Sequence, residues 1–273
     1  MLTGELDLHG KKITSAGIMT MVKAPKPDAD GSGDAIAPTD DKCLKHILLI
    51  LESCRIESKG LSMIVTVGNT KGGTGKSSIA VSLAIGRGGK VLLIDSDRQG
   101  TTETVMLVRA QSGRLPFVPC LKICDGQELY DKVTASKDQF ADIIIDAGGR
   151  DSSALRAAMA VSDLVLVPFA PRSLDVWALS DMDALVTEAR AVNPALRALA
   201  MLSCADSTGH DNRDAVEALQ AYQQLVYLPF PISRRKSVAN AVGLGLSVLE
   251  LKPKDDKAIA ELKNLLNSVF MPL

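Results

Sequence analysis

Residues 63–78 read MIVTVGNTKGGTGKSS, and this stretch decides the fold. Its first six residues form an apolar run typical of a buried strand, and a helical pattern starts at Ser77. A glycine-rich turn between a strand and a helix lets backbone N–H groups close around phosphate oxygens, and the start of the helix adds the positive end of its dipole. The stretch therefore predicts a phosphate-binding loop at the first strand-to-helix turn.

Short apolar runs and amphipathic stretches alternate from Met63 onwards. This alternation predicts an α/β fold with a parallel, largely doubly wound sheet and helices on both faces, and the phosphate loop at its first turn is typical of the P-loop NTPase class. The core is expected to be aliphatic, because 46% of the residues are apolar but only 3% are aromatic. Ligands of such sheets bind beyond the carboxyl ends of the strands. We predict strands at Met63–Gly68, Val91–Asp95, Asp142–Asp146, Leu164–Phe169 and Leu199–Cys204, and helices at Ser77–Gly86, Gly126–Ser136, Asp151–Val161, Ser173–Val192 and Asn212–Leu225.

The first 62 residues differ from the rest of the chain. Residues 23–42 (KAPKPDADGSGDAIAPTDDK) contain little that a core could bury, so we expect disorder there. Residues 43–56 (CLKHILLILESCRI) predict a short apolar helix, which either docks a partner or packs loosely on the main domain. A third interpretation is that translation begins at Met63. The sequence thus divides into an N-terminal extension, 1–62, and a P-loop domain, 63–273.

The loop residues suit a nucleoside triphosphate with a magnesium ion. Lys76 is expected to reach the β- and γ-phosphates, and the Ser77 hydroxyl to bind Mg²⁺. The general pattern G-x-x-x-x-G-K-[ST] is not met strictly, because Thr70 stands at its first position, and a second lysine, Lys71, opens the loop. The expected phosphate-contacting residues are Gly72, Gly73, Thr74, Gly75, Lys76, Ser77 and Ser78.

Carboxylates stand at the carboxyl ends of two predicted strands. Asp95 and Asp97 lie in LLIDSDRQG (92–100), beside the expected phosphate loop. Such a pair is costly to bury without cations, and Mg²⁺ and an attacking water supply a reason for it. Asp146 ends the apolar run of IIIDAGG (143–149), which has the form of a Walker B motif holding Mg²⁺. The two glycines that follow would give a mobile loop able to sense the γ-phosphate.

The loop Lys-Gly-Gly-x-Gly-Lys-Ser resembles the deviant Walker A motif of the ParA/MinD family of ATPases. In that family the first lysine, here Lys71, reaches the phosphates bound by the other subunit, so that two nucleotides lie between two protomers. Residues 95–100 resemble the family's D-x-D-P-Q-G segment, with Arg98 in place of the usual proline. By that match, Asp97 positions the hydrolytic water, and Asp95 supports the metal site or the loop. The resemblance implies catalytic Lys71, Lys76 and Asp97, and a metal site at Ser77, Asp95 and Asp146.

Two later segments extend the resemblance to the C-terminus, where it is strongest to the small, ParF-like ParA proteins. Residues 167–178 (VPFAPRSLDVWA) are similar to a family segment at the dimer face, although Trp177 could equally anchor a helix to the core. Residues 228–232 (LPFPI) resemble the adenine-pocket region, which implies that Pro229 and Pro231 contact the base. The resemblance covers residues 63–273, and we find no helix-turn-helix pattern in the extension before them.

The resemblance implies an ATP-dependent homodimer that hydrolyses ATP slowly, binds DNA non-specifically and is stimulated by a ParB-like or centromere-binding adaptor. Such a protein is expected in the cytoplasm, associated with the nucleoid when ATP is bound. Lysine and arginine contacts to phosphate release counterions, so a local basic surface would suffice for DNA. The candidate residues, which could also form only a solvated basic face, are Arg234, Arg235, Lys236, Lys252 and Lys254.

Other functions remain alternatives. A MinD-like membrane-cycling ATPase needs a C-terminal amphipathic helix with a basic face. Residues 255–273 carry apolar residues at helical spacing but a mixed polar face, so we expect a core-packing helix and no membrane partner. The same switch could position a protein assembly. Cys120 and Cys124 lack a second pair or a histidine cluster, so neither a zinc site nor an iron–sulfur carrier is indicated.

Overall fold

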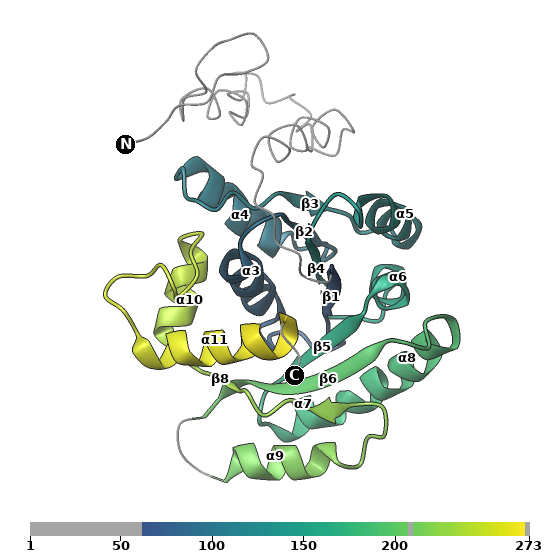
Figure 1. Ribbon diagram of the computed structural model, residues 1–273. Helices are drawn as coiled ribbons and strands as arrows, with labels where there is room; N and C mark the ends of the chain where they lie inside the picture. The colour runs from purple at the N-terminus through teal and green to yellow at the C-terminus, as the bar shows by residue number, and fades with distance from the viewer. Residues whose placement is uncertain (1–61, 207–209, 271–273) are drawn as a thin grey trace, which may run out of the picture.

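The computed structural model describes residues 62–206 and 210–270, which fold around one parallel sheet (Figure 1). The strand order is β3-β2-β4-β1-β5-β6-β7, and β8 pairs with β6. The predicted doubly wound α/β fold is confirmed, whereas the expectations for residues 1–61 lie outside the described part of the chain. The elements run β1 (Met63–Val67), α3 (Lys76–Arg87), β2 (Val91–Asp95), α4 (Thr101–Gln111), β3 (Cys120–Lys122), α5 (Gly126–Ser136), β4 (Asp142–Asp146), α6 (Ser153–Val161), β5 (Leu164–Phe169), α7 (Ser173–Trp177), α8 (Leu179–Val192), β6 (Arg197–Ala205), α9 (Asp211–Leu219), β7 (Val226–Tyr227), β8 (Ile232–Ser233), α10 (Lys236–Gly243) and α11 (Asp256–Phe270).

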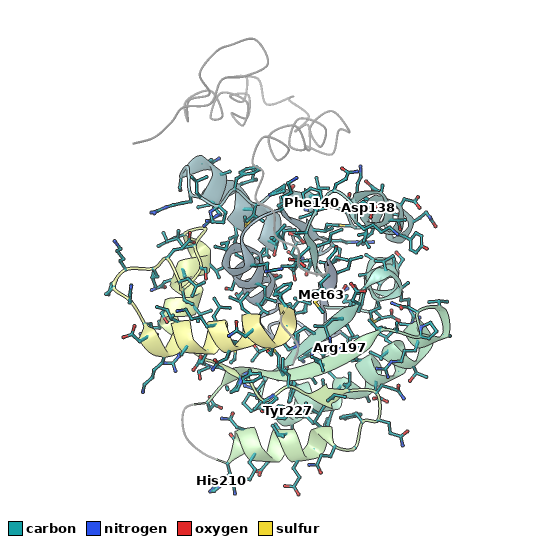
Figure 2. The ribbon with its side chains drawn as sticks, viewed as in Figure 1. Met63, Asp138, Phe140, Arg197, His210 and Tyr227 are labelled. Carbon is teal, nitrogen blue, oxygen red and sulfur yellow. The ribbon has the colours of Figure 1, made fainter. Side chains whose placement is uncertain are left out.

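The helices form a layer on each face of the sheet (Figure 1). One layer contains α3, α4, α10 and α11, and the other contains α5 to α9. Side chains alternate between them along each strand, as the pleat requires. In β4, Ile144 packs with the α3 layer while Ile143 and Ile145 pack with α5 and α6, and all three are fully buried. Met63 and Arg197 mark the amino ends of β1 and β6 (Figure 2). The phosphate loop follows the carboxyl end of β1, at the opposite end of the strands.

Helix α11 packs on the core, as expected from its mixed polar face. Leu262, Leu265 and Val269 are buried, and the last two belong to the cluster around α3. Gly86 of α3 permits this close approach, because a Cβ there would lie 2.7 Å from Leu266 Cδ1. Within residues 62–206 and 210–270, the helices are all too short or too polar to span a bilayer.

Several elements are absent from the sequence-based prediction. Helix α4 was missed because its apolar residues give only a weak helical stripe, and β3 because it has three residues. The two-residue strands β7 and β8 and the helix α10 were missed as well. The predicted helix Ser173–Val192 is interrupted at Ala178, which separates α7 from α8. The predicted helix at Asn212–Leu225 ends at Leu219, since the chain must turn there to enter β7.

Candidate nucleotide-binding site

The loop between β1 and α3 has the backbone that a phosphate cradle needs. Gly73 and Gly75 have φ of 78° and 81°, in the left-handed region that favours glycine. Gly75 is the N-cap of α3 and offers no side-chain cap, so the first N–H groups of the helix remain available to an anion. A Cβ on Gly75 would lie 2.8 Å from Ser203 Oγ, which ties the loop closely to the end of β6.

Asn69 holds the start of the loop in place. It is fully buried; its Nδ2 donates to Pro168 O at 2.9 Å, and its Oδ1 accepts from Lys71 N at 3.0 Å. The loop is therefore fastened to the carboxyl end of β5, the neighbouring strand. Sequence reasoning missed this role, although a polar residue directly after a buried strand was a signal for it.

The two lysines of the loop lie in different surroundings. Lys76 is buried, and its Nζ donates to Lys71 O at 2.8 Å. Burial lowers the pKa of Lys76, while the carboxylates of Asp146 and Asp97 counteract this shift. An incoming phosphate would supply the anion that this desolvated ammonium lacks. The side chain of Lys71 is instead exposed.

Asp146 combines deep burial with an unused oxygen. It is fully buried, and burial raises its pKa to about 7, against the hydroxyls of Thr102 and Ser77, which lower it. Thr102 Oγ1 donates to Oδ2 at 2.6 Å, whereas Oδ1 has no hydrogen-bond partner. A buried carboxylate oxygen near the Ser77 hydroxyl fits Mg²⁺, which takes oxygen ligands from one or two side chains and completes its shell with phosphate and water. Within residues 62–206 and 210–270, no cluster of three or more His, Cys, Asp or Glu side chains is arranged to hold a metal.

Both carboxylate oxygens of Asp95 accept hydrogen bonds from backbone N–H groups. It pairs in register with Asp146, and its Oδ1 and Oδ2 accept from Asp97 N at 3.0 Å and Glu103 N at 2.9 Å. Burial raises its pKa, and these two amides lower it. Of the two predicted roles, these contacts favour loop support over direct metal ligation.

Asp97 lies where three loops meet. It is half-buried, and its Oδ1 accepts from Gln99 N at 3.0 Å. A Cβ on Gly148 would stand 3.4 Å from Asp97 Cγ, and one on Gly149 would stand 3.3 Å from Lys76 Nζ. The structure thus brings Lys76 and Asp97, two of the three side chains predicted for catalysis, together at the ends of β1, β2 and β4, whereas Lys71 is exposed.

The predicted base-contacting prolines lie just before β8, whose Ile232 pairs with Ser203 at the end of β6. Pro231 is half-buried and lines a surface groove of about 510 Å³ with Asn212 and Tyr227, whereas Pro229 is exposed and does not line it. Their contact with adenine stays a prediction. The core-anchor interpretation of Trp177 is wrong, because its side chain is 66% exposed.

The predicted basic residues separate into two groups. Arg235 donates from Nη2 to Glu261 Oε1 at 2.8 Å, so its charge is largely neutralised. Arg234 and Lys236 are exposed beside it. Lys252 and Lys254 instead line a groove of about 1080 Å³ between α10 and the start of α11. Sequence reasoning missed a third lysine in this groove, Lys257, because Asp255 and Asp256 precede it.

Comparisons with known proteins agree with this geometry. Residues 65–248 match the family model described as the CobQ/CobB/MinD/ParA nucleotide binding domain. "Maintenance of carboxysome distribution protein A" of Halothiobacillus neapolitanus is 26% identical over 209 residues, 76% of this chain and 95% of that protein.

Two solved structures share the fold. A plasmid partition protein from Borrelia burgdorferi has a TM-score of 0.56 and 19% identity, covering 76% of this chain and 96% of that one. The septum site-determining protein MinD of Pyrococcus horikoshii, complexed with Mg-ADP, has a TM-score of 0.59 and 18% identity, covering 77% and 96%.

Proposed function

Because the chain belongs to the CobQ/CobB/MinD/ParA family of nucleotide-binding domains, we propose that it is an ATPase that dimerises on binding ATP and positions a large cellular cargo. The observation that carries this proposal is the meeting of buried Lys76, half-buried Asp97 and the unpaired Asp146 Oδ1 at the carboxyl ends of β1, β2 and β4. The Mg-ADP bound by the similar MinD structure supports the same ligands for this chain.

The phosphates lie over residues 71–78, along the open start of α3. Lys76 Nζ exchanges its contact with Lys71 O for phosphate oxygens, which costs little because it already lies at the loop. The Ser77 hydroxyl and Asp146 would hold Mg²⁺, which would neutralise charge on the β- and γ-phosphates. Asp97 orients the attacking water from its position beside Gly148.

Dimerisation uses the exposed Lys71. Its own protomer gives its side chain no ion pair among the described residues, so its charge is available to phosphates held by a second copy. A lysine added from the partner makes dimer stability depend on the negative charge of the nucleotide, which is the basis of a switch.

DNA binding is assigned to the α10–α11 groove, defined here as the groove lined by Lys252, Lys254 and Lys257. The groove is lined by these three exposed lysines and also by Asp255 and Asp256, so the lysines leave it with a net positive charge. This charge attracts phosphates without base specificity, and dimerisation doubles it. A ParB-like or centromere-binding adaptor would link the dimer to its cargo and stimulate hydrolysis. ATP-bound protein would then gather on the nucleoid.

A second candidate cargo is a protein assembly, as the named role of the similar protein from Halothiobacillus neapolitanus suggests. The ATP-dependent dimer would be unchanged, and only the adaptor protein would differ. A membrane-cycling role has less support, because the apolar face of α11 is already buried against α3.

The test is co-sedimentation with DNA and, in parallel, with anionic lipid vesicles, each with and without MgATP. The proposal expects MgATP-dependent pelleting with DNA alone, and Lys76→Ala should abolish it. Pelleting with vesicles alone would instead support the membrane alternative.

A further inference from the structure

Helix α4 starts at the nucleotide site. Its first turn receives both buried carboxylates at the strand ends, because Thr102 Oγ1 donates to Asp146 Oδ2 at 2.6 Å and Glu103 N donates to Asp95 Oδ2 at 2.9 Å. Thr102 is itself fully buried. Any shift of α4 along its axis would therefore move the hydroxyl that occupies one oxygen of the metal-site aspartate.

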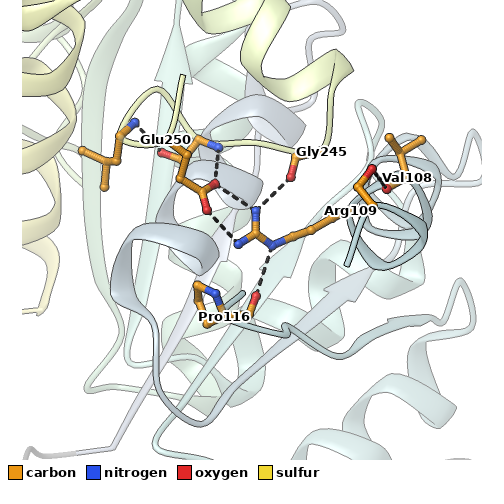
Figure 3. Close-up of polar contacts among 8 residues, drawn as sticks. Val108, Arg109, Pro116, Gly245 and Glu250 are labelled. Atoms are coloured by element: carbon orange, nitrogen blue, oxygen red, sulfur yellow. Dashed lines mark hydrogen bonds and ion pairs between the residues drawn. The ribbon is translucent and has the colours of Figure 1, made fainter. Parts of the chain in front are cut away.

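Near its other end, α4 is fastened by Arg109 (Figure 3). The Arg109 side chain is 1% exposed, and its guanidinium donates to Glu250 through two bonds of 2.8 and 2.9 Å. It also donates to Gly245 O at 2.9 Å and to Pro116 O at 3.1 Å. Burial of an arginine is sustained only when its charge and its N–H groups are satisfied in this way.

The backbones of Gly245 and Arg109 are also in close contact at this point. Gly245 has φ of 69°, and a Cβ there would lie 2.6 Å from Arg109 N. Glu250 Oε2 also accepts from Ser247 N at 3.0 Å, which closes the 245–250 segment around the guanidinium. The segment and α4 are therefore in direct contact through both backbone and side chains.

The 245–250 segment connects, along the chain, two pairs of residues that line the α10–α11 groove. Gly243 and Leu244, just before it, and Leu251 and Lys252, just after it, all line that groove. A set of contacts thus runs from Asp146 through Thr102 and α4 to Arg109 and Glu250, and Glu250 is followed in the chain by Leu251 and Lys252 of the groove.

We propose that Arg109 is a positioning residue, which makes polyanion binding in the α10–α11 groove and Mg-nucleotide binding at Asp146 depend on each other. This inference rests on the proposed function, since it takes DNA as the occupant of the groove. A rigid helix fastened at both ends transmits a displacement, and coupling between two ligands is reciprocal. A polyanion that shifts residues 244 and 252 changes the geometry of Thr102 at the metal site, and Mg-nucleotide changes the groove.

The experiment measures this coupling as a ratio of affinities. The affinity for a non-specific DNA duplex is measured with and without the Mg complex of a non-hydrolysable ATP analogue, and the affinity for that analogue with and without the duplex. The variants are Arg109→Lys, Glu250→Gln and the double variant Arg109→Met/Glu250→Leu, which leaves no buried charge unpaired. The double variant also guards against a single variant that fails to fold.

For wild type we expect each ligand to strengthen the other about tenfold. In the folded variants this factor should fall to about twofold or less, while each ligand alone binds within about twofold of wild type. Arg87→Lys is the matched control, because Arg87 pairs with Asp142 at 2.6 Å at the amino end of the sheet, away from both sites. A merely structural Arg109 would alter thermal stability but not the coupling factor.

The outcomes separate the two ideas. Wild-type coupling that persists in a folded Arg109 or Glu250 variant overturns the inference and leaves the proposed function standing. A wild type without any effect of Mg-nucleotide on DNA affinity contradicts the proposed function itself. Loss of coupling in Arg87→Lys as well would also overturn the specific role of Arg109.

Discussion

The nucleotide site and the α10–α11 groove both carry charged side chains, yet they are built in opposite ways. At the nucleotide site Lys76, Asp95 and Asp146 are buried, and their positions are set by hydrogen bonds to loops and helices. In the groove the charges of Lys252 and Lys254 are exposed on long side chains. Buried charges fix the geometry of a site, and their substitution has large effects on ligand binding. Exposed lysines give weak, salt-sensitive attraction without base specificity.

The largest effect is expected at the buried lysine. Lys76→Ala should weaken ATP binding about 1,000-fold or more, because charge-assisted bonds to two phosphates are lost. Titration with a fluorescent ATP analogue measures this loss, and Lys90→Ala, remote from the loop, is the control. Unchanged affinity in the Lys76 variant would move the phosphate site elsewhere.

Asp146 makes stability depend on pH. Its pKa is raised from 3.8 to about 7 in the folded protein, so the folded state binds the extra proton between these values. Stability is therefore lost as the pH rises from about 4 to about 7, by about 4 kcal/mol for this group. Burial raises the pKa of Asp95 as well, in the same direction.

Denaturant unfolding of nucleotide-free protein across this range tests the sign. Asp146→Asn should flatten the loss, while Asp151→Asn, an exposed change, should not. MgATP should stabilise the wild type more at high pH, because the metal favours the ionised carboxylate. A wild type whose stability rises steadily from pH 5 to 7 would contradict this assignment.

The next effect concerns hydrolysis alone. Asp97→Ala should reduce turnover about 100-fold, because the water loses its orienting group, while ATP binding persists. The variant should accumulate as an ATP-bound dimer in size-exclusion chromatography. Asp151→Ala provides an exposed acidic control, and fast turnover by the Asp97 variant would refute the role of Asp97.

The smallest effect is expected in the groove. Lys252→Glu with Lys254→Glu should weaken DNA binding about tenfold at low salt and reduce the salt dependence. The equivalent reversals at Lys132 of α5 and at Lys137, the C-cap of that helix, on the other face of the sheet, should have little effect. Arg234→Glu with Arg235→Glu should also weaken DNA retention while sparing ATP binding, although Arg235 is partly neutralised by Glu261. Equal loss from the α5 reversals would mean that DNA binds without a defined surface.

The contrast between the regions also explains what the sequence could predict. The phosphate loop and the acidic strand ends are local in sequence, since each role follows from a residue type directly after an apolar run. The structure brings Lys76, Asp97 and Asp146 together as expected. The sheet was equally accessible, because continuous aliphatic runs identify buried parallel strands.

Contacts between residues far apart in the sequence could not be predicted in this way. Arg109 and Glu250 are 141 positions apart, and neither stands in a motif. Thr102 reaches Asp146 across 44 positions from a helix whose weak apolar stripe went unrecognised. For the same reason, proximity in sequence could not show that Arg235 of the predicted basic cluster pairs with Glu261 on α11.

The central claim is that nucleotide closes a two-fold dimer through the exposed Lys71. Sedimentation velocity with and without saturating MgATP tests it most directly, with Lys71→Ala measured beside wild type. The account predicts that wild type doubles its mass only with MgATP and that the variant binds ATP but stays monomeric. Wild type that remains monomeric in saturating MgATP would contradict it.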